Sequence, residues 1–177
     1  MIPEKEKMVR VRPHTCCFTG HREIYDEDRE TLRRAVGREI EALIQKGYTS
    51  FINGGAVGFD LIAAGEVLRL KARYPKISLL LSIPSKEHED TRYGTWQEDY
   101  NKAKAAATKV EYASELYRPG CEHERNRKMV DWSSAIIVYC RKKSGGSFYT
   151  LNYAKEKGLQ IIMIDISPKK RLSGAQK

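Results

Sequence analysis

Short apolar runs alternate with amphipathic segments along almost the whole chain. The runs are rich in β-branched residues and lack the alternating polar positions of a half-exposed strand, so they predict strands that are buried on both faces. Between them, apolar residues recur every three or four positions, which is typical of helices with one buried face. The predicted strands cover 15–20, 49–53, 77–83, 109–113, 134–140 and 160–166, and the predicted helices cover 26–47, 58–73, 96–107, 122–132 and 147–157.

This order of elements predicts an α/β fold. Strands that alternate with helices form a doubly wound, mostly parallel, Rossmann-like sheet, here of about six strands with helices on both faces. The first long helix illustrates the pattern, because Leu32, Val36 and Ile40 share one face. Asp26 is a candidate N-cap of that helix, and Gly47 is a candidate stop signal.

In such a sheet every loop that leads from a strand into a helix lies at the carboxyl edge. The unusual residues of this chain fall in those loops, whereas the loops that lead into strands carry ordinary glycine stops. We therefore expect one ligand site at the carboxyl edge, formed by segments 19–22, 53–60, 83–89, 115–126 and 142–147.

Two glycine-bearing loops are candidates for binding phosphate. Gly54, Gly55 and Gly58 precede a helix, where free backbone N–H groups would point at an anion; the alternative is a tight turn in which Asp60 accepts hydrogen bonds from first-turn amides. The second loop adds hydroxyl donors to two glycines at a second helix start, and consists of Ser144, Gly145, Gly146 and Ser147.

Other candidates surround these loops. Gly20, His21 and Arg22 end the first strand, and Arg22 suits bidentate contact with a phosphate or carboxylate. His21 is interpreted as a hydrogen-bonding wall residue rather than an acid or base. We further expect Arg125 and Asn126 to project into the crevice, unless Arg125 forms a helix salt bridge with Glu122 or Glu124, and we expect Tyr117 to stack on a base.

The chain of 177 residues is long enough for one domain, predicted at 15–166 between a basic N-terminal extension, 1–14, and a basic flexible tail, 167–177. The extension contributes +2 and the tail +4 to the formal net charge of +9, and the difference leaves about +3 for the body. Nucleic acid is therefore an open but not favoured partner.

The four cysteines form no CxxC pair, and Cys121 with His123 offers too few ligands for a tetrahedral site, so no metal site is predicted. The apolar runs are shorter than a membrane span, and the N-terminus is charged where a signal peptide would be apolar. We expect a cytoplasmic protein without a membrane partner. A homo-oligomer is also expected, with Trp96, Trp132 or tyrosines at its interface.

Taken together, four ordered motifs resemble the SLOG superfamily, specifically its YpsA-like branch, which is related to the DprA and LOG proteins. The motifs are FTGHR (18–22), INGGAVGFD (52–60), the pair RN with MVDWSSAIIVY (125–139) and SGGSFYTLNYA (144–154). The resemblance extends over 15–166 and implies a Rossmann-like fold that binds nucleotides or nucleotide-derived ligands.

The resemblance leaves three functions to compare. We favour the sensing or sequestration of a ligand such as ADP-ribose, NAD or a cyclic ADP-ribose-type signal, with no cofactor required. LOG proteins are N-glycosidases whose PGGxGTxxE glutamate would fall at Asn152 here, which leaves Asp60 and Glu98 as weak catalytic candidates, with Glu122 the other acid in reach. DprA-type binding of single-stranded nucleic acid is the third alternative. Whether the chain is an enzyme stays open.

Overall fold

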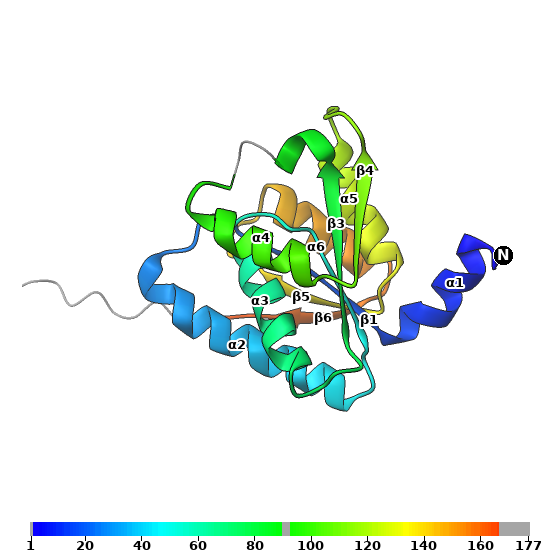
Figure 1. Cartoon of the computed structure of the whole chain (residues 1–177), viewed down its shortest axis with the longest axis horizontal. Helices are drawn as coiled ribbons and strands as arrows, with labels where there is room; N and C mark the ends of the chain where they lie inside the picture. Colours follow the sequence, from blue (N-terminus) through cyan, green and yellow to red (C-terminus); the bar gives the residue numbers. More distant parts are fainter. Residues whose placement is uncertain (1, 90–92, 167–177) are drawn as a thin grey trace, which may run out of the picture.

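The computed structural model describes residues 2–89 and 93–166, in which strands alternate with helices (Figure 1). Six parallel strands lie in the order β4-β3-β2-β1-β5-β6. This arrangement confirms the predicted doubly wound sheet. The strands are β1 (Thr15–Gly20), β2 (Ser50–Asn53), β3 (Ser78–Ser85), β4 (Lys109–Ser114), β5 (Ala135–Tyr139) and β6 (Gln160–Met163).

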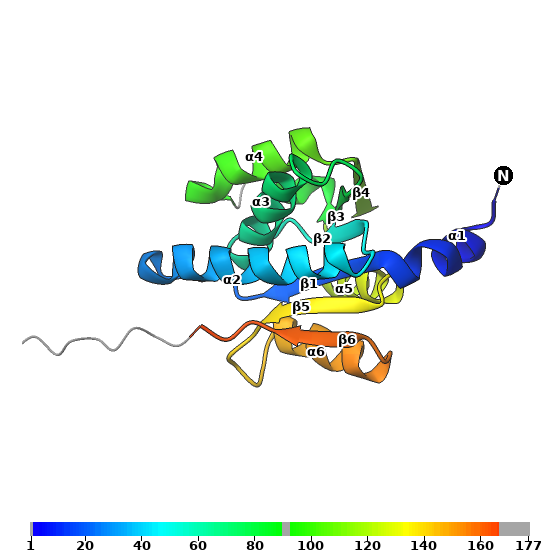
Figure 2. The same cartoon turned by 90° about the horizontal axis from the view of Figure 1, so that it is seen from below.

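Helices cover both faces of this sheet (Figure 2). One face packs against α2 (Asp26–Gln45), α3 (Phe59–Lys71) and α4 (Gln97–Ala106), and the other against α5 (Cys121–Asp131) and α6 (Gly146–Glu156). Consecutive residues of a strand point to opposite faces. Accordingly, Cys16 packs in the core on the α2–α4 side and Cys17 in the core on the α5–α6 side, and both are fully buried.

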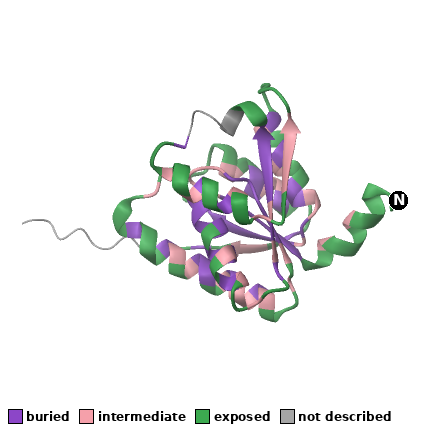
Figure 3. Ribbon diagram, viewed as in Figure 1, coloured by how far each residue is buried: buried purple, intermediate pink, exposed green. Residues whose placement is uncertain are grey.

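The N-terminal segment contains a helix that the sequence pattern did not predict. It forms helix α1 (Glu4–Val11), followed by a 3-10 turn at Arg12–His14. The helix has acidic residues in its first turn and Arg10 in its last turn, which suits the helix dipole. Every residue of α1 is exposed or half-buried, whereas β1, β2, β3 and β5 are largely buried and the edge strands β4 and β6 are half-buried or exposed (Figure 3).

Helix α2 also begins differently from the sequence interpretation. Tyr25 occupies the N-cap position and Asp26 already lies inside the helix, so Asp26 is not the cap. Asp26, Glu27 and Asp28 instead place three carboxylates in the first turn, where they stabilise the positive end of the helix dipole. At the other end, Gly47 has a φ of 94° and ends the helix as expected.

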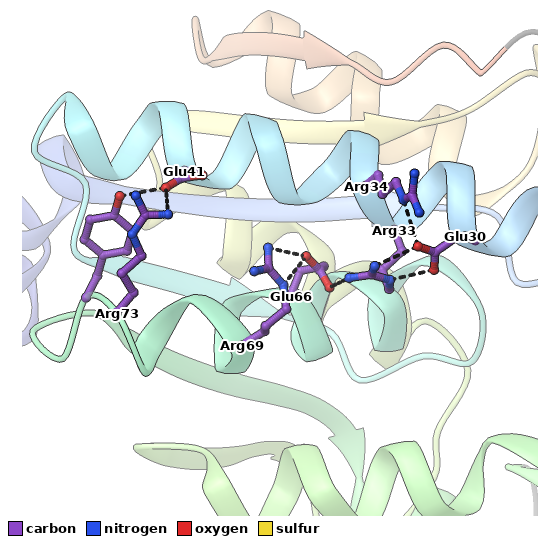
Figure 4. A network of polar contacts seen from close by, with 8 residues as sticks. Glu30, Arg33, Arg34, Glu41, Glu66, Arg69 and Arg73 are labelled. Atoms are coloured by element: carbon purple, nitrogen blue, oxygen red, sulfur yellow. Dashed lines mark hydrogen bonds and ion pairs between the residues drawn. The ribbon is translucent and has the colours of Figure 1, made fainter.

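A polar network joins α2 to α3 (Figure 4). The carboxylate of Glu66 is only 3% exposed and accepts hydrogen bonds from Arg33 at 2.7 Å and from Arg69 at 2.9 Å. Gly37 provides the room for this carboxylate, because a Cβ at position 37 would lie 2.5 Å from Oε2 of Glu66. The network thus explains a glycine in the middle of a helix, where this residue otherwise costs stability.

Candidate ligand-binding cleft

The strand order reverses between β1 and β5, and the chain leaves these neighbours toward opposite faces of the sheet. Ligands of open α/β sheets bind in the crevice at the carboxyl ends of such strands. A cleft of about 350 Å³ lies there. Its lining includes most of the residues predicted from the sequence: Gly20, His21, Arg22, Asp60, Arg125, Asn126, Ser144, Gly145, Gly146 and Ser147.

The loop before α6 forms one wall of the cleft. Gly145 has a φ of 86°, which favours glycine, and α6 begins at Gly146. A Cβ at either glycine would meet nothing within 4 Å, so the space beside the helix start is open. Because the first N–H groups of a helix have no acceptor within it, this open end suits an anion. Ser147 Oγ donates to the carbonyl oxygen of Gly20 at 2.7 Å and fixes the loop against β1.

The loop before α3 is built differently. The N–H of Phe59 donates to the carbonyl oxygen of His21 at 3.0 Å, and that of Gly55 to Asn53 Oδ1 at 2.8 Å. A Cβ at Gly58 would lie 2.3 Å from the carbonyl oxygen of Arg22. The first helix amide is therefore occupied by the chain itself. Gly58 permits close packing of two loops rather than contact with a ligand, and it lies outside the cleft lining.

Close packing also explains why positions 54 and 55 are glycines. A Cβ at Gly54 would lie 2.6 Å from Nη1 of Arg125 and 2.7 Å from Oδ2 of Asp60, and a Cβ at Gly55 would lie 2.7 Å from Ile83. Both glycines line a small cavity of about 50 Å³ that adjoins the cleft, since Arg22, Glu122 and Arg125 line both. Of the two glycine loops, the one before α6 thus offers the open helix start.

Asp60 accepts a hydrogen bond from the N–H of Ala56 at 3.3 Å, which is an amide of the loop and not one of the first-turn amides expected in the tight-turn alternative. Its side chain nevertheless lines the cleft and is 7% exposed. Burial raises the pKa of Asp60 to about 6, against the opposing effect of the Arg125 guanidinium. A carboxyl group at this position therefore changes its charge just below neutral pH.

Arg125 is 4% exposed, and its side chain links separate segments of the chain by hydrogen bonds. Its Nη1 donates to the carbonyl oxygen of Gly54 and, at 3.0 Å, to that of Ser82, while Nε donates to Asn126 Oδ1 at 2.7 Å. Arg125 lines the cleft as expected, but its Nη1 and Nε are not free to contact a ligand, because the carbonyl oxygens of Gly54 and Ser82 accept from Nη1 and the side chain of Asn126 accepts from Nε. Burial lowers the pKa of this guanidinium, with Asp60 opposing the effect.

His21 forms part of the wall between β1 and β5. Its Nε2 lies 2.7 Å from the N–H of Arg141, which donates to it, so Nε2 is unprotonated. Burial lowers the pKa of His21, and the charges of Lys142 and Arg141 lower it further. The neutral ring thus accepts a backbone hydrogen bond, which is the geometry of a wall residue.

Charged side chains surround the mouth of the cleft. Arg22 forms an ion pair with Glu122 at 3.2 Å, and Lys142 and His123 also line the cleft. Glu124, the other acid considered for Arg125, instead pairs with Arg118 at 2.6 Å. Sequence reasoning did not select His123 or Lys142 as ligand contacts. His123 lies two residues after the start of α5 and Lys142 three residues after the end of β5, and this position at the carboxyl edge is the signal that could have identified them.

Two predicted residues lie away from the cleft. Tyr117 is exposed, and its N–H donates to Glu87 Oε2 at 2.8 Å. Glu98 is paired with Lys102 at 2.6 Å on the solvent side of α4, with its side chain 78% exposed. Neither lines the cleft. Within residues 2–89 and 93–166, no three metal-ligating side chains cluster, and no helix is long and apolar enough to cross a bilayer.

The strand order and the cleft at its switch point define a Rossmann-like α/β protein. A family model described as the YspA SLOG family matches residues 16–167, and the chain belongs to this family, as its motifs predicted. Among relatives, the chain is 30% identical to a UPF0398 protein of Halalkalibacterium halodurans over 73% of this chain and 70% of that protein. It is also 30% identical to YoqJ, an uncharacterized SPbeta prophage-derived protein of Bacillus subtilis, over 66% of this chain and 76% of YoqJ.

Two solved structures share the fold. DNA processing protein A (DprA) of Streptococcus pneumoniae superimposes with a TM-score of 0.64 at 16% identity, over 95% of this chain and 54% of DprA. The Helicobacter pylori DprA, known for its single-stranded DNA binding mode, gives 0.62 at 20% identity, over 94% of this chain and 70% of that protein. The chain thus spans about half the length of the first DprA. At these identities the likeness shows the fold alone.

Proposed function

We propose that this protein binds a nucleotide-derived ligand, of the type of ADP-ribose, NAD or a cyclic ADP-ribose signal, in the cleft between β1 and β5. One observation carries the proposal: a glycine loop opens the start of α6 toward a cleft at the switch point of the sheet. A phosphate group there would accept hydrogen bonds from the first N–H groups of α6 and from Ser144. The cleft volume of about 350 Å³ falls within the range of small-molecule sites.

Charges at the mouth support an anionic ligand. Arg22 is 54% exposed and paired with Glu122, so its guanidinium can exchange this carboxylate for a phosphate without leaving the protein surface. Lys142 adds a second positive charge to the same wall. Arg125 contributes to the potential of the cleft although its Nη1 holds the loops together.

We propose binding without robust turnover. Asn152 stands where LOG-type proteins carry their glutamate, and Glu98 points to solvent on α4. The acids that line the cleft are Asp60 and Glu122. If turnover occurs, these are the residues whose removal should abolish the release of base or nicotinamide.

Calorimetric titration of protein freed of copurified nucleotide, with ADP-ribose, NAD and cyclic ADP-ribose, tests the proposal. We expect saturable binding of at least one ligand, and loss of that binding in Gly146→Leu, whose side chain would extend into the open space beside the helix start. Gly65→Ala is the matched control, since its Cβ also meets nothing within 4 Å but lies on α3 away from the cleft. Absence of binding by all three ligands would reject the proposal.

Single-stranded DNA is the second candidate ligand, because the Helicobacter pylori DprA binds it and shares the fold. In this case phosphodiester groups would occupy the same helix start. Binding would then fall steeply as salt is raised and would be lost in Gly146→Leu. DNA binding that disappears only when residues 167–177 are removed would assign it to the basic tail and reject the cleft as its site.

A further inference from the structure

A second cavity, larger than the ligand-binding cleft, lies toward the amino ends of β1 to β4, between these strands and α5. Its volume is about 540 Å³, and α1 contributes to its lining. We call this space the amino-edge cavity. Among the residues that the structure describes, none lines both this cavity and the cleft, so the proposed function does not account for it.

The sheet gives the amino-edge cavity an apolar floor. Ile52 of β2 lies beside Leu80 of β3 in the strand register, and both side chains face the α5–α6 side. Met129 of α5 and Trp132 at its end line the cavity from the other side. Leu80 and Trp132 are only partly buried, so apolar surface of both is open to an occupant. Such walls favour a hydrocarbon chain or ring, because binding there removes apolar surface from water.

The β4 side of the cavity is polar and carries an excess of positive charge. Lys109 of β4 lies beside Leu80 in the strand register, and Glu111 lies two residues further along β4. The carboxylate of Glu111 forms ion pairs with Lys109 and, at 3.4 Å, with Lys128 of α5. Two ammonium groups thus share one carboxylate, which leaves a net charge of +1 at this end of the cavity.

The rest of the lining does not remove this charge. Glu4 and Lys7 of α1 balance each other, so the whole lining, with three lysines and two glutamates, has a net charge of +1. Ser82 adds a hydroxyl beside Glu111, and the hydrogen bond that Ser82 accepts from Arg125 uses its carbonyl oxygen rather than this hydroxyl. One carboxylate on the occupant would therefore neutralise the excess charge and accept hydrogen bonds from the lysines.

We propose that the amino-edge cavity binds one small amphipathic carboxylate, of the class of a medium-chain fatty acid. Its head group would lie against Lys109 and Lys128, and its chain would lie between Leu80 and Trp132. The volume of about 540 Å³ falls within the range of small-molecule sites. A neutral or cationic amphiphile would leave the positive charge of the lining unbalanced. This site goes beyond the nucleotide-binding cleft and does not depend on it.

Calorimetric titration of the full chain with decanoate, below the concentration at which it forms micelles, tests the proposal. We expect saturable one-to-one binding, and weaker binding of decanol, which has the same chain without the charge. Lys128→Gln should weaken decanoate binding about 2–5-fold and leave decanol binding unchanged. Lys155→Gln is the matched control, since Lys155 is exposed on α6 and lies outside the cavity lining.

Two further variants locate the bound molecule. In Trp96→Phe the remaining tryptophan is Trp132, whose fluorescence should change with the same affinity as calorimetry gives. Gly146→Leu, which should block the cleft, should still bind decanoate. No saturable binding of decanoate, equal affinity for decanol, or equal loss in Lys128→Gln and Lys155→Gln would overturn the proposal. So would binding that leaves Trp132 fluorescence unchanged or that disappears in Gly146→Leu.

Discussion

Ser147 Oγ donates to the carbonyl oxygen of Gly20 across 2.7 Å and joins the first turn of α6 to the end of β1. The two residues are 127 positions apart in the sequence, and both line the cleft. The same hydroxyl that could have reached a ligand thus holds the glycine loop in place. Its role is to position the neighbouring N–H groups.

Replacement of Ser147 by alanine should therefore weaken both folding and binding. The loss of one partly buried hydrogen bond predicts a fall of about 0.5–1.5 kcal/mol in the free energy of unfolding, measured by urea titration. Ligand affinity should fall as well, because the loop before α6 loses its anchor. Ser147→Thr keeps a hydroxyl and should retain most of both properties; equal damage by the two substitutions would argue against the hydrogen bond as the cause.

Gly54→Ala and Gly65→Ala should change stability in opposite directions. A Cβ at Gly54 would lie 2.6 Å from Arg125 and 2.7 Å from Asp60, both of which are buried, so we expect destabilisation of about 1–3 kcal/mol. A Cβ at Gly65, inside α3, meets nothing within 4 Å, and alanine there should stabilise by about 0.5–1 kcal/mol. Differential scanning calorimetry would measure both changes in stability. A Gly54→Ala variant as stable as the native protein would contradict the role of Arg125 in linking these segments.

Ionisation of the Asp60 carboxyl group should lower the free energy of unfolding as pH rises. Its pKa of about 6 in the folded state exceeds the reference value of 3.8, so the folded protein binds the proton more tightly than the unfolded chain does. The stabilisation is fully present below pH 3.8 and is lost as pH rises to about 6, at a cost of about 3 kcal/mol.

Comparison with Asp60→Asn isolates this effect. The free energy of unfolding of the variant minus that of the native protein should grow between about pH 4 and pH 7, since asparagine does not ionise. Urea titrations at several pH values would measure the difference. A difference that stays constant with pH would show that Asp60 does not titrate in this window.

Glu122→Gln should strengthen the binding of an anionic ligand. The carboxylate of Glu122 lines the cleft and competes for Arg22, so its removal frees the guanidinium and takes away a repulsive charge. We expect a gain of about 2–5-fold in affinity at low salt, which diminishes as salt is raised. Glu124→Gln is the control, because Glu124 pairs with Arg118 outside the cleft and its loss should leave calorimetric affinity unchanged.

The central strands could be predicted because they repeat one simple signal. All residues of β5 are buried on both faces, and β-branched residues without polar alternation specify that environment, whereas the edge strands β4 and β6 are only partly buried. Helix α1 was not predicted, for the opposite reason. Its residues are largely exposed, so they leave no apolar period to detect, and only the charges at its two ends mark it as a helix.

The candidate site was harder to predict residue by residue. The sequence places Gly58 and Gly146 at the same edge of the sheet. It does not show which atoms fill the space beside each glycine. In the structure the carbonyl oxygen of Arg22 lies against Gly58, while the space beside Gly146 is open. In the same way, the spacing of α5 brings Arg125 to the edge without revealing that Gly54 and Ser82 accept its protons. Such partners come from loops distant in sequence.

The adjacent cysteines of β1 are buried thiols whose reaction can report the opening of the domain. Cys16 and Cys17 lie in different core layers, Cys121 is also buried, and Cys140 alone of the four is partly accessible. An aromatic disulfide reagent should thus modify one thiol quickly in the native protein and the other three only when the domain opens. The rate at which those three thiols react would measure how fast the helix layers on both faces separate from β1. No added label is needed.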